Sequence, residues 1–375
     1  MKKVSLHELL IETANKSLEI INEKKGFYPS GKNGPHQHKE TSVRNTAHWL
    51  ITLLKVFKIT KEEKFLKAAK LAINYLLSDE VRPYGFTFIN RKVDGLDSCN
   101  GLIGQAWAIE ALAEASKILG CEDCKEKAEE VFLLHPFDWD LGLWKARDID
   151  GNIMKGFDLT LNHQIWFAAA GSIIKDSNSS KVSRQINRFL DCLRANISLS
   201  SEGRFLMPVD GKPHLLKGAL YTAIKTSKLY NWLRLTRRGD NKKEMEKGYH
   251  CCHLYGLAML KDNFPGHELW SSKIIKKSIN YLFFEDFKQS VMKNKYGINY
   301  NPPGFETAYT LYMFKDIIDM SNDALLKSMS DWVSKQIIKT YNFEDKMMNQ
   351  VKFDPETYAA RVYEATRLPD INVTI

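Results

Sequence analysis

The chain has 375 residues, and its 44% hydrophobic and 26% charged residues are the ordinary balance of a globular protein. The net charge of +9 would suit nucleic acid, an anionic membrane or an acidic substrate, but the lysines are mixed with glutamates in helical segments such as KEEKFLKAAK, which is typical of solvated helix faces. No apolar run reaches the roughly 18–20 residues of a membrane span. The start, MKKVSLHELLIETANKSLEII, reads as an amphipathic helix rather than a signal peptide. We therefore expect a cytoplasmic protein without a nucleic-acid partner or a membrane span.

Helical periodicity runs through almost the whole chain, with apolar residues three and four positions apart. It predicts twelve helices, over 5–24, 41–57, 61–78, 100–119, 122–134, 157–175, 179–196, 245–262, 266–283, 304–319, 322–341 and 354–368. The segment YGFTFI at 84–89 has strand character, but it is at most one arm of a short hairpin. The sequence therefore predicts an all-α fold.

The predicted helices are of two kinds, which alternate. One kind has a polar stripe and belongs on the outside, whereas the other, as in NGLIGQAWAIEALAEASKILG, is apolar or small on most sides and must be covered by neighbours. Helices of the second kind begin near 41, 100, 157, 245, 304 and 354, a period near 55–60 residues with one insertion at about 197–244. The insertion holds a polar loop and a further helix, GALYTAIKTSKLYNWL. This pattern predicts a single domain over 1–375, an (α/α)6 toroid of six helical hairpins that helix 5–24 closes.

The connections between the predicted helices differ in length. Links from an inner to an outer helix are short, but the links back, 25–40, 79–99, 135–156, 284–303 and 342–353, are long and rich in Gly, Pro, aromatic and charged residues. All the long links then lie at one end of the ring, around the N-terminal ends of the inner helices. Because long loops on a rigid scaffold usually carry function, we expect a cavity there.

Polar side chains recur at these N-terminal ends, more often than helix capping alone would explain. They are Glu40, Arg44, Asn45 and His48; Asp97, Asn100 and Gln105; Asp158, Asn162 and His163; Tyr249, His250 and His253; Glu306; and Asp354, Glu356 and Arg361. Aromatic residues accompany them, and rings that stack on sugars beside groups that bind hydroxyls suit a carbohydrate. We predict that the substrate is bound by Arg44, His48, Asn100, Gln105, Trp107, Asn162, His163, Tyr249, His250 and Arg361.

Three carboxylates of this set are candidates for acid–base catalysis at a glycosidic or uronic centre. Asp158 follows Phe157 at the start of its predicted helix, and a partly apolar setting would raise its pKa. Asp97 and Glu306 are the candidates for a second carboxylate. Their distance from Asp158 would separate retaining geometry, about 5 Å, from inverting geometry, about 6.5–9.5 Å. A plain capping role is the alternative for each aspartate.

Two motifs resemble one known family. FDLTLNHQIWFAAAG, residues 157–171, resembles the stretch that carries the catalytic Asp of unsaturated glucuronyl hydrolases, and GQAWAIEALAEA, residues 104–115, resembles their Gly-Gln-Ala-Trp motif. Those enzymes are six-hairpin toroids that hydrate a double bond of a terminal uronic acid. The resemblance implies that Asp158 is the general acid/base and Asn162 its neighbour in the site.

The sequence departs from that family at two positions and shares features with a second group. Ile103 stands where an Arg normally precedes the Gly-Gln-Ala-Trp motif, which lies here on the second inner helix, and Cys99 stands where the second family carboxylate is expected. Asp97 or Asn100 could replace that carboxylate. EKGYHCCHLYGLAMLKDNFP and YGINYNPPGFETAY are similar to uncharacterised six-hairpin proteins of bacterial surface-polysaccharide clusters, which would place Tyr249, His250, Asn301, Pro302, Pro303, Gly304 and Glu306 at the cavity rim.

The leading hypothesis is a glycoside hydrolase whose partner is an acidic oligosaccharide or polysaccharide intermediate, such as one that contains uronic acid. A first alternative is a polysaccharide lyase or uronate epimerase, in which His163, His250 or Tyr249 takes the C5 proton and Arg44 or Arg361 neutralises the carboxylate. A second alternative is a toroid that binds glycan without turning it over.

The cysteines and the glycine patterns give no sign of a metal or cofactor. Cys121 and Cys124 form one CxxC without a second pair at zinc-ribbon spacing. Cys251 and Cys252, beside His250 and His253, read better as small buried thiols of a helix than as a zinc site. Neither a nucleotide-binding glycine motif nor a GxSxG motif is present. We expect no metal and no cofactor, and either a monomer or a homodimer.

Overall fold

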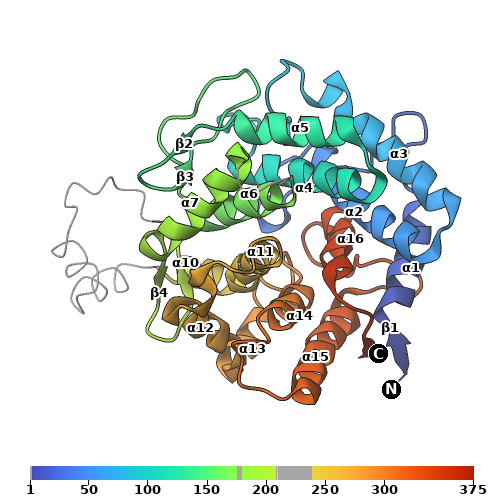
Figure 1. Ribbon diagram of the computed structural model, residues 1–375. Helices are drawn as coiled ribbons and strands as arrows, with labels where there is room; N and C mark the ends of the chain where they lie inside the picture. The colour runs from blue at the N-terminus through green and yellow to red at the C-terminus, as the bar shows by residue number, and fades with distance from the viewer. Residues whose placement is uncertain (1, 175–179, 208, 210–238) are drawn as a thin grey trace.

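The computed structural model describes residues 2–174, 180–207, 209 and 239–375, which form a ring of helices (Figure 1). The α-helices are α1 (Leu6–Ser17), α2 (Val43–Thr60), α3 (Glu63–Leu77), α4 (Gly101–Leu119), α5 (Glu122–Leu133), α6 (Leu161–Ile174), α7 (Lys181–Asn196), α10 (Asp240–Gly248), α11 (His250–Asn263), α12 (Lys273–Asn280), α13 (Glu285–Val291), α14 (Pro303–Met313), α15 (Asn322–Thr340) and α16 (Pro355–Ala360). The 3-10 helices are η1 (Gly34–His36), η2 (Asp79–Val81), η3 (Glu268–Ser271), η4 (Tyr281–Phe283) and η5 (Arg361–Arg367).

Six helical segments pack side by side to form the inner ring. Helix α2 contacts α4, α4 contacts α6, α6 contacts α11, and α11 contacts α14. The sixth segment is α16 with η5, which packs between α14 and α2 and so closes the ring. The outer helices α1, α3, α5, α7, α12 and α15 surround it (Figure 1). The predicted all-α toroid is confirmed.

The two predicted kinds of helix differ in burial as their sequences require. Helix α4 is buried on every side from Gly101 to Ala115, because neighbours cover its apolar and small residues all round. Helix α7 buries a stripe that includes Val182, Ile186 and Leu193 and exposes its charged side. Close packing of the inner helices against the outer ones depends on small residues. In α6, for example, a Cβ on Gly171 would lie only 2.2 Å from Cε2 of Phe132.

Some element boundaries differ from the prediction. Helix α1 ends at Ser17 rather than near 24, and the chain turns back through Gly26, whose φ is +78° and whose Cβ would meet the Leu71 carbonyl oxygen at 2.1 Å. The sixth inner helix is α-helical only to Ala360 and continues as η5. Helices α10 and α13 lie where we expected an insertion and a long link. The further helix expected for GALYTAIKTSKLYNWL lies outside the described residues.

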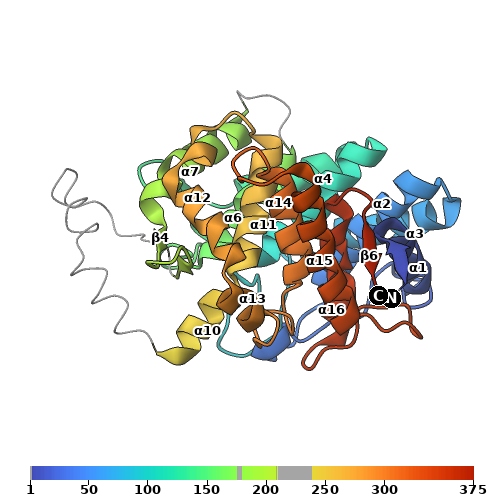
Figure 2. The same ribbon diagram turned by 90° about the horizontal axis from the view of Figure 1, so that it is seen from below.

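Strands in the described residues are three short antiparallel pairs. They are β1 (Lys3–Ser5) with β6 (Asn372–Thr374), β2 (Phe137–Asp138) with β3 (Leu143–Trp144), and β4 (Ser198–Leu199) with β5 (Phe205–Leu206). The first pair joins the two ends of the chain, which lie side by side (Figure 2). Residues 84–89 form no strand. No helix of the described chain combines the length and the apolar character that a membrane crossing needs.

A column of buried charged side chains fills the axis of the ring. A 3-10 helix has three residues per turn, so Arg361, Glu364 and Arg367 of η5 share one face. Arg361 Nη2 lies 2.6 Å from Glu364 and 3.2 Å from Glu306. Arg367 binds Glu110 at 2.7 Å and Glu114 at 2.8 Å. The tighter helix therefore aligns alternating charges along the axis.

We expect Gly171→Ala to lower the free energy of unfolding by about 1–3 kcal/mol, because the new methyl group overpacks against Phe132. This cost should exceed the gain of about 1 kcal/mol in helix propensity that Ala brings. Urea unfolding of the full chain measures the change. Gly266→Ala is the control, since its Cβ would meet nothing within 4 Å. Equal unfolding free energies for the two variants would contradict the packing argument.

Candidate active site

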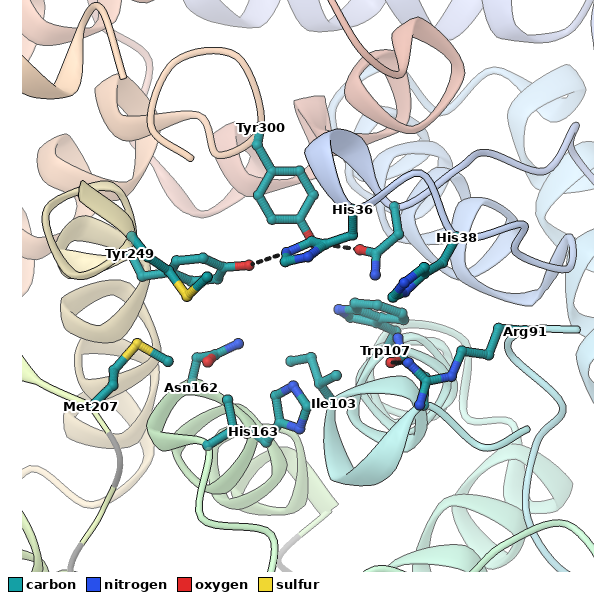
Figure 3. Close-up of a pocket in the computed structure, with 14 residues that line it drawn as sticks. His36, His38, Arg91, Ile103, Trp107, Asn162, His163, Met207, Tyr249 and Tyr300 are labelled. Atoms are coloured by element: carbon teal, nitrogen blue, oxygen red, sulfur yellow. Dashed lines mark hydrogen bonds between the residues drawn. The ribbon is translucent and has the colours of Figure 1, made fainter. Parts of the chain in front are cut away.

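A cavity of about 190 Å³ opens where the inner helices begin, at the end of the ring where the sequence predicts it (Figure 3). One side is formed by His36, His38, Arg91, Tyr249 and Tyr300. The starts of α4 and α6 supply Asn100, Ile103, Trp107, Thr160, Asn162 and His163. Met207 and Met245 add an apolar part. A hollow of about 30 Å³ continues the cavity toward the axis, where Arg44, His48, Arg361 and Tyr363 line it.

Asp158 and His163 form a hydrogen-bonded pair beside the cavity. The Asp158 carboxylate accepts from His163 Nδ1 at 2.7 Å and from the backbone N–H groups of Leu102 at 3.1 Å and Thr160 at 3.2 Å. Burial acts to raise the pKa of Asp158, but His163 and the two backbone donors together lower it to about 2. Asp158 is therefore an anion that holds the Nδ1 hydrogen of His163 and leaves Nε2 of that ring for other partners.

The backbone at the start of α4 lies so close to Asp158 and His163 that it requires a glycine. Gly101 has a φ of +57°, and a Cβ there would lie 2.5 Å from the Asp158 carboxylate and 3.1 Å from His163 Nδ1. Its neighbour Asn100 is also left-handed, with a φ of +57°. This unusual pair of residues lets the backbone at the start of α4 reach Asp158.

His36 lines the cavity on the side that faces His163 (Figure 3). Its Nε2 lies 3.3 Å from the hydroxyl of Tyr249. Burial, together with the nearby side chains of His38 and Arg44, lowers the pKa of His36 to about 4. His36 is therefore neutral at physiological pH and can accept a proton.

The floor of the cavity combines aromatic rings with a paired arginine. Arg44 binds Glu40 at 3.1 Å, and its guanidinium lies 4.0 Å above the ring of Trp107. His48 stacks on Tyr363 at 4.2 Å, and neither of its ring nitrogens has a hydrogen-bond partner among the described residues. Burial, with Arg44 and Arg361, holds the pKa of His48 well below its usual value. A neutral ring with free nitrogens is suited to bind a hydroxyl group.

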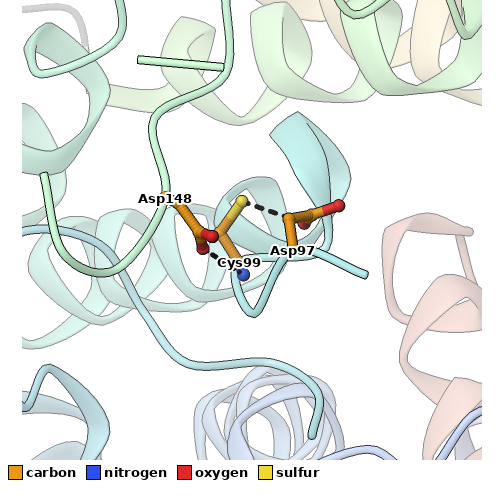
Figure 4. Close-up of side chains that lie close together, drawn as sticks. All are labelled: Asp97, Cys99 and Asp148. Atoms are coloured by element: carbon orange, nitrogen blue, oxygen red, sulfur yellow. Dashed lines mark hydrogen bonds between the residues drawn. The ribbon is translucent and has the colours of Figure 1, made fainter. Parts of the chain in front are cut away.

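Asp97, Cys99 and Asp148 come close together beside the start of α4 (Figure 4). One oxygen of Asp148 accepts from the N–H groups of Ser98, Cys99 and Ile149 at 2.9–3.1 Å. One oxygen of Asp97 accepts from Gly101 N–H at 2.8 Å and Cys99 Sγ at 3.1 Å, and the other pairs with Arg91. These bonds explain the cluster as a turn that shapes the cavity wall.

The structure brings most of the predicted binding residues to the cavity or its floor, namely Arg44, His48, Asn100, Trp107, Asn162, His163, Tyr249 and Arg361. Gln105 is fully buried and clamps the loop before α4 through Phe88 and the Cys99 carbonyl. His250 is also fully buried, between the Phe205 N–H and the Ser278 carbonyl. Their predicted contacts with substrate stay predictions.

The three predicted catalytic carboxylates lie behind the cavity wall. Asp158 holds His163, and Asp97 holds Arg91 and the start of α4. Glu306 lies at the axis of the ring. Burial and the Glu364 carboxylate raise the pKa of Glu306 well above its usual value, against the opposing effect of Arg361. None of the three is among the residues that line the cavity.

Sequence reasoning did not single out His36, His38, Asn33 or Arg91. They lie in the long links 25–40 and 79–99, outside any helical period. One signal could have identified the two histidines. It is the HQH pattern at 36–38, which follows Gly34 and Pro35 in a link already expected at the cavity.

Comparison with known proteins gives one similar sequence and several similar folds. The chain is 38% identical to archaeal glycosylation protein Q of Haloferax volcanii over 375 residues, which cover 98% of this chain and 99% of that protein. No family model matches. A D-mannose isomerase has a TM-score of 0.64 at 13% identity, and a heparin-specific unsaturated glucuronyl hydrolase has 0.59 at 10% identity. Each comparison covers 96% of this chain and 95% of the other. These structures share the fold, and the predicted resemblance to six-hairpin carbohydrate-active toroids is confirmed.

We expect Asp158→Asn to lower the free energy of unfolding at neutral pH by about 2 kcal/mol, which is the equivalent of a pKa lowered from 3.8 to about 2. The folded-state pKa is the lower one, so the stabilisation is present above about pH 4 and is lost as the pH falls toward 2. The difference in the free energy of unfolding between wild type and variant, measured in urea, should therefore become smaller over that pH range. Asp94→Asn, at an exposed position, is the control. A gap that stays constant down to pH 2 would contradict the ionised pair.

Proposed function

This chain belongs to the family of archaeal glycosylation protein Q, and from that premise we propose that it is a sugar isomerase or epimerase that serves glycan assembly. The observation that carries the proposal is the pair of histidines on opposite sides of one cavity. His163 is hydrogen-bonded to the Asp158 carboxylate, whereas His36 is half-buried beside His38 and Arg44. Two titratable groups whose environments differ in this way can act as acid and base.

The geometry supports a proton-transfer reaction at a carbon next to a carbonyl group. His36, being neutral, takes the proton from carbon, while His163, which the Asp158 carboxylate holds through Nδ1 at 2.7 Å, gives a proton to the carbonyl oxygen. The product is an enediol. Return of the proton from His36 to the neighbouring carbon gives the isomer. Its return to the same carbon, after the enediol has turned its opposite face to His36, gives the epimer. No atom is gained or lost, and the two histidines exchange roles in the second half.

Hydrolysis by carboxylates, the leading hypothesis from the sequence, has less support from the geometry. A glycosidase acid must be a carboxyl group whose pKa is raised and which reaches the glycosidic oxygen. The pKa of Asp158 is about 2, and the pKa of Asp97 is also lowered, because hydrogen bonds from Gly101 and Cys99 and the charge of Arg91 outweigh its burial. Glu306 belongs to the axial column. The proposal therefore follows the proton-transfer alternative, but it gives the role of the base to His36 and makes His163, which that alternative named as a candidate base, the acid.

The rest of the cavity suits one sugar unit. Trp107, Ile103, Met207 and Met245 offer apolar surface. Buried polar atoms without a partner, among them Asn162 Oδ1 and both ring nitrogens of His48, gain hydrogen bonds when sugar hydroxyls arrive.

The acidic character of the sugar stays a prediction from the sequence. Arg44 and Arg361 lie at the floor, as a carboxylate would require, but each is already paired with a buried glutamate.

The test is exchange of carbon-bound hydrogen in D2O, followed by proton NMR. Free hexoses, 6-deoxyhexoses and hexuronates are incubated with the full chain, together with the methyl glycosides of the hexuronates. A free sugar that exchanges beside its carbonyl indicates aldose–ketose or C2 chemistry. A methyl glycoside that exchanges at C5 indicates a uronate epimerase, because that ring cannot open. Unsaturated uronyl disaccharides, followed by the ultraviolet absorbance of the double bond, test the hydrolase hypothesis in parallel.

We expect His163→Gln and His36→Gln each to lower kcat by about 10²–10⁴-fold, the usual contribution of a positioned acid or base. Asp158→Asn should lower kcat with little change in KM, because it acts through His163. His7→Gln, on outer helix α1, is the matched control and should keep wild-type activity. Loss of uronyl absorbance without any deuterium exchange would overturn the proposal in favour of hydrolysis.

A further inference from the structure

A disulfide lies in the short link between inner helix α4 and outer helix α5, at the end of the ring away from the candidate active site. It joins Cys121 to Cys124, the two cysteines of the CxxC motif, whose Cα atoms are 5.3 Å apart. We propose that this pair is a redox site, which exchanges its disulfide with external thiols through Cys121 and uses Cys124 as the resolving thiol. The exchange does not depend on the proposed sugar chemistry, and it can be measured without any sugar.

The two cysteines differ in their access to solvent. Cys124 is fully buried in the core, whereas Cys121 is half-buried. The link around the half-buried residue is open, since Glu122 and Asp123 are exposed and a Cβ on Gly120 would meet nothing within 4 Å. A thiolate from solution can therefore approach Cys121 but not Cys124. Because access decides which sulfur is attacked, the exchange has a defined order.

Cys121 also caps the N-terminus of α5, and this cap can persist after reduction. Its Sγ accepts from the backbone N–H of Cys124 at 3.3 Å, and its φ of −78° and ψ of 98° are those of an extended N-cap residue. In the reduced form a thiolate at this place is a stronger acceptor, because the N-terminus of a helix favours negative charge. The helix therefore keeps its cap in both redox states, and reduction does not require α5 to unfold.

A purely structural cross-link is the alternative role of the disulfide. A cross-link stabilises a fold mainly by restricting the unfolded chain, and this effect grows with the length of the loop that it closes. Here only Glu122 and Asp123 stand between the two cysteines, and both already belong to the first turn of α5. The remaining cysteines of the sequence are free, namely Cys99, Cys192, Cys251 and Cys252. Disulfides are therefore not the general means by which this fold is held together.

The exchange takes place in two steps. A thiolate attacks Sγ of Cys121, the bond to Cys124 breaks, and a mixed disulfide forms on Cys121 while Cys124 leaves as a thiolate. A second external thiolate attacks the outer sulfur of the mixed disulfide, which releases the external disulfide and leaves Cys121 as a thiolate. The two cysteines take up the two protons that the external thiols lost. Two external thiols are thus oxidised and the protein disulfide is reduced, and oxidation of the protein is the reverse.

Reduced and oxidised glutathione are the probe. The full chain is equilibrated at a series of glutathione ratios and quenched with acid, and its thiols and mixed disulfides are then located by peptide mass spectrometry. We expect the wild type to change reversibly between disulfide and dithiol, with an unchanged circular dichroism spectrum. In the reduced, folded chain we expect Cys121 to be alkylated about tenfold or more faster than Cys124, because it is the accessible thiol.

Two variants separate the roles of the cysteines. Cys124→Ala removes the resolving thiol, so we expect glutathione to stay on Cys121 as a mixed disulfide. Cys121→Ser keeps an N-cap acceptor, and its buried Cys124 should stay free of glutathione. Cys192 is the internal control, because it is half-buried like Cys121 but unpaired, and its modification should be equal in all three proteins. Should Cys124→Ala not fold, the alkylation rates of the reduced wild type test the same difference in access.

Three outcomes would overturn the proposal. One is a disulfide that glutathione and dithiothreitol reduce only when the folded structure is lost, which would make it a structural cross-link. Another is equal alkylation of Cys121 and Cys124 in the reduced, folded chain. The third is a mixed disulfide on Cys124 in the Cys121→Ser variant, because it would show that the buried sulfur is open to attack.

Discussion

The buried charges of the axial column are the constraint on which the rest of the structure depends. Arg361 is almost fully buried beside Glu306 and Glu364, and such a group is costly unless its partners are in place. The 3-10 geometry of η5 meets this requirement, because it puts Arg361, Glu364 and Arg367 on one face. Closure of the ring and pairing of the column are therefore one event. The helix that closes the toroid also supplies its central cations.

The site extends the same electrostatic arrangement toward the mouth. Burial lowers the pKa of His48 and of His36; Arg44 and Arg361 act in the same direction on His48, and His38 and Arg44 do so on His36. On the opposite wall Asp158 supplies a compensating negative charge beside His163. The two histidines of one cavity thus have different surroundings.

Much of the fold could be predicted because the inner and outer helices of a toroid of hairpins have different patterns of apolar residues, which recur along the chain. Helices such as α4 and α7 differ in their apolar pattern, and this difference decides which lies inside. The start of α6 was found for the same reason, with Asn162 and His163 correctly placed at a cavity. The change from α16 to η5 left no such signal, because it follows from charges that meet only in the folded ring. Nor could the sequence show that three donors converge on Asp158 and lower its pKa, or that His36 joins the site from a loop.

Because the column of buried charges fills the axis of the ring, the cavity opens at one end of the ring and does not continue through it. The hollow at the other end of the inner helices, lined by residues such as Lys55, Glu114 and Arg367, shares no residue with the cavity. A molecule that reaches Arg361 therefore has nowhere further to go and must leave backwards through the opening it came in by. A long glycan could insert only a chain end and could not thread through the ring.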